Sequence, residues 1–119
     1  MSTNAIISIV RDGNVITKII CGCDGNRAEE TVRDIISYMI CKGDPTNIMS
    51  IYMLCQINKL GCRDCLVVMN ETESYSIETQ DEKDPETERR YRDTFDDPEF
   101  NPRTTNGKGA SHIFIIPAL

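Results

Sequence analysis

The chain begins with two short apolar runs that are separated by a turn sequence. Residues 5–10 and 15–20 are rich in β-branched side chains, and Asp12-Gly13 lies between them. Asp-Gly between two such runs is a strong signal for a β-hairpin. Because both runs are apolar at nearly every position, we expect a sheet that is covered on both faces, or one that is covered on one face and used for assembly on the other.

An amphipathic helix is predicted over residues 27–42. Asn26 is the expected N-cap, with Glu29 three residues later as in a capping box, and Gly43 is expected to stop the helix. The apolar positions recur at spacings of three and four, which places them on one face. These positions are Ala28, Val32, Ile35, Ile36, Met39 and Ile40.

A second, more buried helix is expected to begin at Asp44-Pro45, with Asp44 as N-cap and Pro45 as first helical residue. Residues 48–60 are apolar nearly all round, and Gly61 can terminate the helix. A strand is the alternative, since residues 51–54 would also fit one. The length of the segment and its two boundary signals favour the helix.

The second half of the chain predicts strands over residues 66–70, 74–79 and 112–116, with the last of them internal to the sheet. A short helix from Pro85 to Phe95 is expected, because proline and acidic residues favour the first turn of a helix. This order predicts an α+β fold, in which an N-terminal β-hairpin and two helices are followed by antiparallel strands that complete one sheet. The length of 119 residues suits a single domain over residues 1–119.

A long polar segment, residues 71–111, separates two of the apolar strands and contains almost no aliphatic side chains. Loops longer than about 15 residues inside a compact domain are usually functional or disordered. Rings that can stack and cations that can clamp phosphates are spaced through this segment. They are Tyr75, Arg89, Arg90, Tyr91, Arg92, Phe95, Phe100, Arg103 and Lys108. The alternative is a loop whose aromatic side chains fold back onto the core.

The distribution of charge limits the partners that the chain can bind. A formal net charge of −6 argues against a general affinity for nucleic-acid backbones. Nine acids lie between Asp81 and Glu99, whereas only the basic groups Arg103 and Lys108 follow Phe100. Any anion site is therefore expected to be local. With no leader sequence and no apolar stretch that could span a membrane, we expect a cytoplasmic protein.

The six cysteines do not predict a disulfide framework, because the cytosol is reducing. Cys41 and Cys55 lie in apolar runs and are expected to be small buried hydrophobic residues. A tetrahedral zinc site could be formed by Cys21, Cys23, Cys62 and Cys65. Reduced cysteines at the ends of secondary-structure elements are the favoured alternative, so we expect no metal and no cofactor.

Two further features of the sequence are candidate sites. His112 is the only histidine, and no nucleophile turn is present, so we do not expect an enzyme. The free amides at the start of the first helix, together with Arg27, could bind an anion. An ordinary helix cap with an exposed arginine is the alternative interpretation.

The chain resembles a phage protein family, the anti-Thoeris proteins that sequester signalling nucleotides. The resemblance lies in the order of elements, in Arg27 at the start of the first helix, and in the late residues Tyr75, Phe95, Arg103 and Lys108. This resemblance implies a compact α+β protein that assembles into a homo-oligomer. It also implies that the protein holds a cyclic ADP-ribose isomer, or a cyclic oligonucleotide, without cleaving it.

Under this interpretation each candidate residue has an expected role. Tyr75 or Phe95 would stack on adenine, and Asn101 would read a polar edge of the ligand. Phosphates would be met by Arg92, Arg103 and Lys108, whereas Arg27 would form a second anion site near a subunit interface. Two alternatives stay open: an acidic inhibitor that binds another protein, for example by mimicking nucleic acid, and a small zinc-stabilised structural module.

Overall fold

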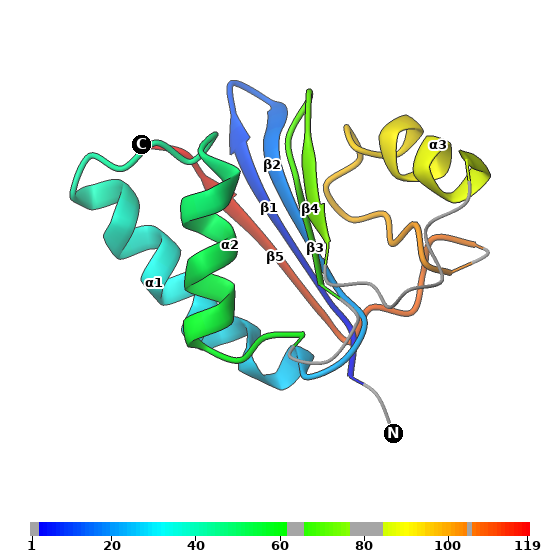
Figure 1. The fold of residues 1–119 in the computed structure, drawn as a ribbon, viewed down its shortest axis with the longest axis horizontal. Helices are drawn as coiled ribbons and strands as arrows, with labels where there is room; N and C mark the ends of the chain where they lie inside the picture. Colours follow the sequence, from blue (N-terminus) through cyan, green and yellow to red (C-terminus); the bar gives the residue numbers. More distant parts are fainter. Residues whose placement is uncertain (1–2, 62–65, 77–84, 105) are drawn as a thin grey trace.

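The computed structural model describes residues 3–61, 66–76, 85–104 and 106–119. Its described strands form one five-stranded sheet in the order β4-β3-β2-β1-β5. Figure 1 shows that α1 and α2 cover one face of this sheet, whereas α3 and the segment after it lie on the other. The predicted α+β fold is confirmed. The elements are β1 (Ala5–Arg11), β2 (Asn14–Cys21), η1 (Gly25–Arg27), α1 (Ala28–Ile40), α2 (Ile48–Ile57), β3 (Leu66–Met69), β4 (Ser74–Ser76), α3 (Pro85–Asp93) and β5 (His112–Pro117).

The predicted N-terminal hairpin is confirmed. Strands β1 and β2 pair antiparallel, with Arg11 opposite Asn14. The two residues between them, Asp12 and Gly13, both have positive φ, at 52° and 81°. A two-residue turn with positive φ at both positions matches the right-handed twist of the strands that it joins.

The boundaries of α1 differ from the prediction. A 3-10 turn, η1, precedes the helix, and Arg27 occupies the N-cap without a side-chain cap bond, so the Asn26 capping box is wrong. The path of the chain into η1 and α1 is set instead by Gly25. Its N–H donates to the carbonyl of Thr3 at 2.8 Å, and a Cβ at this position would collide with the backbone of Thr3 and Asn4. At the other end, Lys42 rather than Gly43 takes the left-handed conformation, with φ 67°.

Helix α2 begins three residues later than predicted and also ends earlier, at Ile57. Its N-cap is Asn47, whose side chain accepts from the N–H of Ser50 at 3.2 Å. The carboxylate of Asp44 instead accepts from the N–H of Thr46 at 2.9 Å within the preceding turn. Asp44 therefore caps its own turn rather than the helix, because the chain turns once more before it becomes helical.

Strand β5 lies at an edge of the sheet, so the prediction of an internal strand is wrong. Among the described strands it pairs with β1, and it does so in parallel, so the prediction that antiparallel strands complete the sheet is wrong for β5 and the sheet is mixed. An apolar run was compatible with both positions, because one of the faces of β5 packs against helices. The expected burial of Cys41 is also wrong, since this residue is exposed just after α1, whereas Cys55 is buried as expected.

The continuous apolar runs of β1 and β2 arise because both faces of the sheet are covered. On β1, the side chains of Ala5, Ile7 and Ile9 belong to the core under α1 and α2. Ile6, one position out of phase, belongs to a second core with Tyr91 and Phe95 of the α3 side. The first of the two alternatives, a sheet covered on both faces, is the observed one.

Two polar side chains on the inner strands attach the α3 side to the sheet. Ser8 and Lys18 are cross-strand partners. The hydroxyl of Ser8 donates to the carbonyl of Pro98 at 2.8 Å. The ammonium group of Lys18 donates to the carbonyls of Thr94 and Asp97 at 3.1 and 2.8 Å. Both strands therefore hold the same short segment, residues 94–98.

Burial sets the protonation behaviour of Lys18. Its side chain is fully buried. Loss of hydration lowers the pKa of Lys18 from 10.5 to about 8, and the nearby Asp97 carboxylate opposes this shift. Between these two values the unfolded chain binds more protons than the folded one. The contribution of Lys18 to the free energy of unfolding therefore rises with pH over this range and is constant below it.

We expect this linkage to be visible when the wild type is compared with Lys18→Met. The difference in the free energy of unfolding, wild type minus variant, should rise by at most about 1.4 kcal/mol per pH unit as the solution passes from the folded to the unfolded pKa. Urea titrations at a series of pH values measure it. The exposed Lys59→Met serves as the control. A Lys18 difference that stays flat would show that the ammonium group is not buried as described.

Candidate functional site

The seven residues predicted to bind a ligand lie on both sides of the sheet. Arg27 is exposed at the start of α1. Tyr75 lies on β4, where its ring centroid is 5.7 Å from that of Tyr52 on α2, and it packs against the core under the helices. The other five come from α3 and the segment after it, on the opposite face, and these are Arg92, Phe95, Asn101, Arg103 and Lys108. Within one chain, Tyr75 and Phe95 therefore cannot face the same ligand.

The arginines and rings of this region contact one another around α3. The guanidinium carbon of Arg90 lies 5.6 Å from the ring centroid of Phe100, within the range of a cation–π interaction. Arg90 also donates to the carbonyl of Thr104. The guanidinium group of Arg103 donates to the hydroxyl of Tyr91 at 3.3 Å. We call Arg90, Tyr91, Phe100 and Arg103 the arginine–aromatic cluster.

Arg92 points away from this cluster. It donates to the carbonyl of Asn70 in the turn between β3 and β4, and it lies 3.7 Å from the carboxylate of Glu88 on its own helix. Arg92 thus joins α3 to the β3–β4 turn. A phosphate that was bound by Arg92 would have to compete with both of these partners.

Three other predicted residues differ sharply in exposure. Phe95 is buried in the second core, and Asn101 is 1% exposed. The side-chain oxygen of Asn101 accepts from the backbone N–H of Arg103 at 3.0 Å, and the backbone N–H of Asn101 donates to the carbonyl of Gly107 at 2.9 Å. Asn101 therefore shapes the loop that carries Arg103. Lys108 is exposed just beyond this loop.

Gly107 fixes the geometry between Asn101 and Lys108. Its φ is +74°, and an added Cβ would collide with the ring of Phe100. The close approach of this backbone to the ring requires glycine. The same contact places Lys108 next to the arginine–aromatic cluster, so that Arg103 and Lys108 are two exposed cations on neighbouring positions of one loop system.

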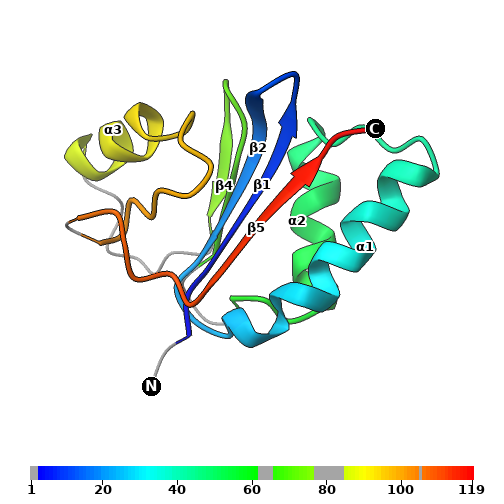
Figure 2. The ribbon, with the colours of Figure 1, turned by 180° about the vertical axis from the view of Figure 1, so that it is seen from behind.

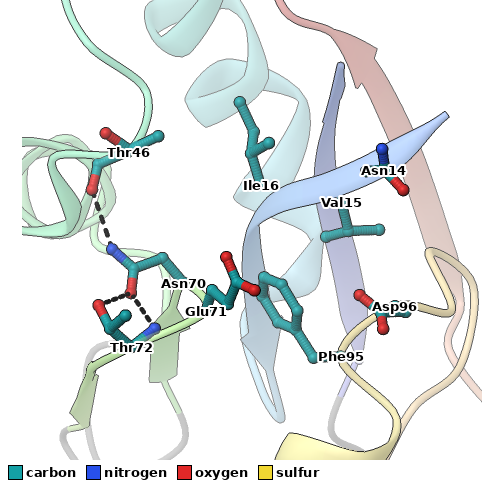
Figure 3. Close-up of a pocket in the computed structure, with 9 residues that line it drawn as sticks. All are labelled: Asn14, Val15, Ile16, Thr46, Asn70, Glu71, Thr72, Phe95 and Asp96. Carbon is teal, nitrogen blue, oxygen red and sulfur yellow. Dashed lines mark hydrogen bonds between the residues drawn. The ribbon is translucent and has the colours of Figure 1, made fainter. Parts of the chain in front are cut away.

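A cleft of about 640 Å³ opens between the start of β2, the β3–β4 turn and the segment after α3 (Figure 3). Of the predicted residues it contains only Phe95. Its charged lining consists of Glu71 and Asp96, and its nine lining residues include no arginine or lysine. The amide of Asn70 shapes one wall, donating to the carbonyl of Thr46 at 3.1 Å and accepting from the N–H of Thr72 at 2.9 Å. This electrostatic lining disfavours phosphates.

The candidate metal and catalytic residues can be placed only in part. Cys62 and Cys65 lie outside the described residues, and the described part of the chain contains no group of three or more potential metal ligands. The thiol of Cys21 donates to the carbonyl of Cys23, and burial raises the pKa of the Cys55 thiol. His112 is exposed and stacks on Phe114, with ring centroids 6.4 Å apart.

Among the described residues, no helix combines the length and the apolar character that crossing a bilayer requires. Comparison with known proteins adds no assignment, because no family model, curated protein or solved structure matches the chain. The functional argument therefore rests on the geometry of the α3 side.

Several residues that shape this region were missed from the sequence. Ser8 and Lys18 stand out as polar residues in otherwise apolar runs, two positions that the hairpin register places opposite each other. That signal could have identified them. Arg90 and Tyr91 could not be separated from Arg89 and Arg92 without knowing which side of α3 meets the sheet, because all four are consecutive.

We expect Asn101 to act on the stability of the loop. Asn101→Ala should lower the free energy of unfolding by about 1 kcal/mol, because it leaves the N–H of Arg103 without its acceptor. Asn26→Ala, at an exposed position without a cap bond, is the matched control and should change it by less than about 0.5 kcal/mol. Denaturant titration measures both. Equal stability of the two variants would rule out the structural role of Asn101.

Proposed function

We propose that the protein binds and sequesters a small cyclic nucleotide signal, a cyclic ADP-ribose isomer or a cyclic oligonucleotide, at the arginine–aromatic cluster. The observation that carries this proposal is the contact of two arginines with two rings on one loop system, Arg90 with Phe100 and Arg103 with Tyr91. Guanidinium groups match the geometry of phosphate oxygens, and the half-buried ring of Phe100 is of the kind that stacks on a base. Tyr91 is buried in the second core, so its role is to hold Arg103 through its hydroxyl. The resemblance to anti-Thoeris sponges, which rests on sequence features alone, supports the same ligand class.

Within the cluster, Arg103 is the residue best suited to hold a phosphate. Its side chain is exposed, and its 3.3 Å bond to Tyr91 is at the long limit of hydrogen bonds. Because the guanidinium group is exposed, a phosphate oxygen can reach it and form a charge-assisted hydrogen bond with it. Lys108, next to the cluster, adds a second positive charge.

Binding at the cluster is compatible with an acidic protein. The ligand is small, and its phosphates meet the local field of Arg103 and Lys108 rather than the net charge of −6. The cleft beside Phe95 is the less suitable place for a phosphate, since Glu71 and Asp96 line it. Sequestration requires tight binding alone, so the proposal needs no nucleophile or general base.

We expect Arg103→Ala to weaken binding of the cyclic nucleotide by about ten- to a hundredfold, because a hydrogen bond to a charged group contributes about 1.5–3 kcal/mol. Calorimetry with a panel of cyclic nucleotides on ligand-stripped protein measures this. Arg33→Ala is the matched control, since Arg33 is an exposed arginine that pairs with Glu29 at 3.0 Å on α1, across the sheet from α3. No heat with any member of the panel, and no small molecule released when the purified protein is denatured, would overturn the proposal.

A second candidate function is favoured by the exposed acids that flank the cluster. Asp93, Asp96, Asp97 and Glu99 are all exposed on the α3 side and could dock onto a basic protein, as a nucleic-acid mimic does. The double change Asp96→Asn and Glu99→Gln separates the two candidates. It leaves out Asp97, whose carboxylate accepts from the N–H of Glu99 and whose carbonyl holds Lys18.

For a nucleotide sponge, we expect the double change to leave nucleotide binding unchanged or to strengthen it slightly, through reduced like-charge repulsion. An acidic inhibitor gives the reverse order, with loss of inhibition for the double change and little effect of Arg103→Ala. The same calorimetric panel, run beside a cellular assay of defence inhibition, distinguishes these outcomes.

A further inference from the structure

The outer edge of β5 is an apolar strand edge with which no described residue pairs. In Figure 2 the β5 ribbon runs along the near border of the sheet. Residues 112–119 contain no charged side chain apart from a titratable histidine. Ile113 and Ile115 are 44% and 49% exposed, on the face opposite the helices. Natural edge strands usually carry charges or other features that block further pairing, and here only Pro117, at the end of the strand, could do so.

The backbone pattern at this edge is self-complementary. The N–H of His112 donates to the carbonyl of Asn4, the residue before β1, and the N–H of Ala118 donates to the carbonyl of Val10 on β1. Because backbone groups alternate along a strand, the N–H and carbonyl groups of Ile113 and Ile115 point outward. In an antiparallel pair centred on Phe114, Ile113 of one copy would lie opposite Ile115 of the other. Both residues would then exchange hydrogen bonds with their partners. Pro117, which has no N–H to donate, would lie opposite Ser111, just outside the strand of the other copy, so it would limit the ladder to the Ile113–Ile115 pairs.

The adjacent flank of α1 is also apolar. Asp34 accepts from the side chain of Asn58 at 2.7 Å, so this side of α1 faces α2. At about 100° per residue, Ile36 and Ile40 lie on the opposite side, which overhangs the β5 edge because α1 packs over β5 and β1. They are 39% and 64% exposed. The charges on this flank, Glu29 and Arg33, pair with each other at 3.0 Å.

We infer that a second copy of this chain covers the β5 edge, through antiparallel β5–β5 pairing that joins the two sheets into one. A two-fold axis through Phe114, perpendicular to the sheet, keeps both α1 helices on the same face. With strands about 4.8 Å apart and α1 centred between β5 and β1, the two α1 axes come to lie about 10 Å apart. This is the distance at which helices pack, and Ile36 and Ile40 of both copies fill the seam.

Size and charge both favour a second copy as the occupant. Six strand residues span about 20 Å, and the sheet and helix layers together measure about 20 Å across, so the projected face is about 400 Å². This projection is about half of the roughly 800 Å² per partner of standard interfaces, so the face is large enough for a weak dimer. On a chain of net charge −6, the part of this face that the structure describes has no unpaired acid, so its described residues set up no like-charge repulsion between two copies.

The test uses the full chain and three variants. At about 100 µM, light scattering should give twice the chain mass of 13.4 kDa for the wild type. Ile36→Glu places like charges across the seam without touching the strand, and Ile115→Lys blocks the edge itself. Both should weaken the dimer at least about tenfold. Met53→Glu is the matched control, because Met53 is a 56% exposed apolar residue on α2, and it should leave the dimer intact.

Hydrogen exchange locates the contact independently of mass. The amides of Ile113 and Ile115 should exchange at least about tenfold more slowly in the wild type than in Ile36→Glu, whose strand sequence is unchanged. A wild-type monomer at this concentration would overturn the inference. So would a dimer that is broken by Met53→Glu but not by Ile36→Glu, or one in which both edge amides exchange freely. Circular dichroism confirms that each variant is folded. The outcome does not depend on nucleotide binding.

Discussion

The α3 side of the molecule depends on a charged group that is buried against the sheet. Lys18 is fully enclosed, yet its ammonium group reaches two consecutive turns of backbone, at Thr94 and Asp97. Desolvation of this charge is costly, and the hydrogen bonds and the Asp97 carboxylate offset only part of the cost, as the lowered pKa of Lys18 shows. The geometry is specific, however. A methionine could fill the same volume, but it could not select which carbonyls meet the sheet, and so it could not fix where α3 and its loop lie.

The sequence predicted which local elements form, but it did not predict where all of them begin or where they lie in the sheet. Hydrophobic periodicity predicted α1, the Asp-Gly turn between two apolar runs predicted the hairpin, and the proline and acidic residues of the first turn predicted α3. It misplaced β5, since a strand with one packed face and one exposed face can be as apolar as an internal one. It also misplaced the start of α1, where the close approach of Gly25 to the backbone near Asn4 decides the entry. Such contacts join residues about 20 positions apart, and no local pattern records them.

The candidate site shows the same division. The composition of the insert identified the region, and five of seven predicted residues do lie on the α3 side. The sequence could not predict on which face of the sheet the Tyr75 side chain lies, because the pairing register decides this. Tyr75 lies opposite Val68, whose side chain belongs to the core under the helices. A shift of one residue would have turned the ring toward α3. Lys18 was missed for a different reason, since a single lysine in a strand is usually at its surface.

The arginines of the α3 side illustrate how one segment can be both structural and available to a ligand. Arg90 and Arg92 donate to backbone carbonyls of other segments, so their removal would leave acceptors unsatisfied and loosen the layer. Arg103 donates to the hydroxyl of Tyr91, which is buried in the second core, while its own side chain is exposed. Of the three arginines, Arg103 is therefore the one that solvent, and hence a ligand, reaches most readily. The carbonyl-bound arginines beside it keep the loop preorganised, so that little ordering entropy is lost when a phosphate binds.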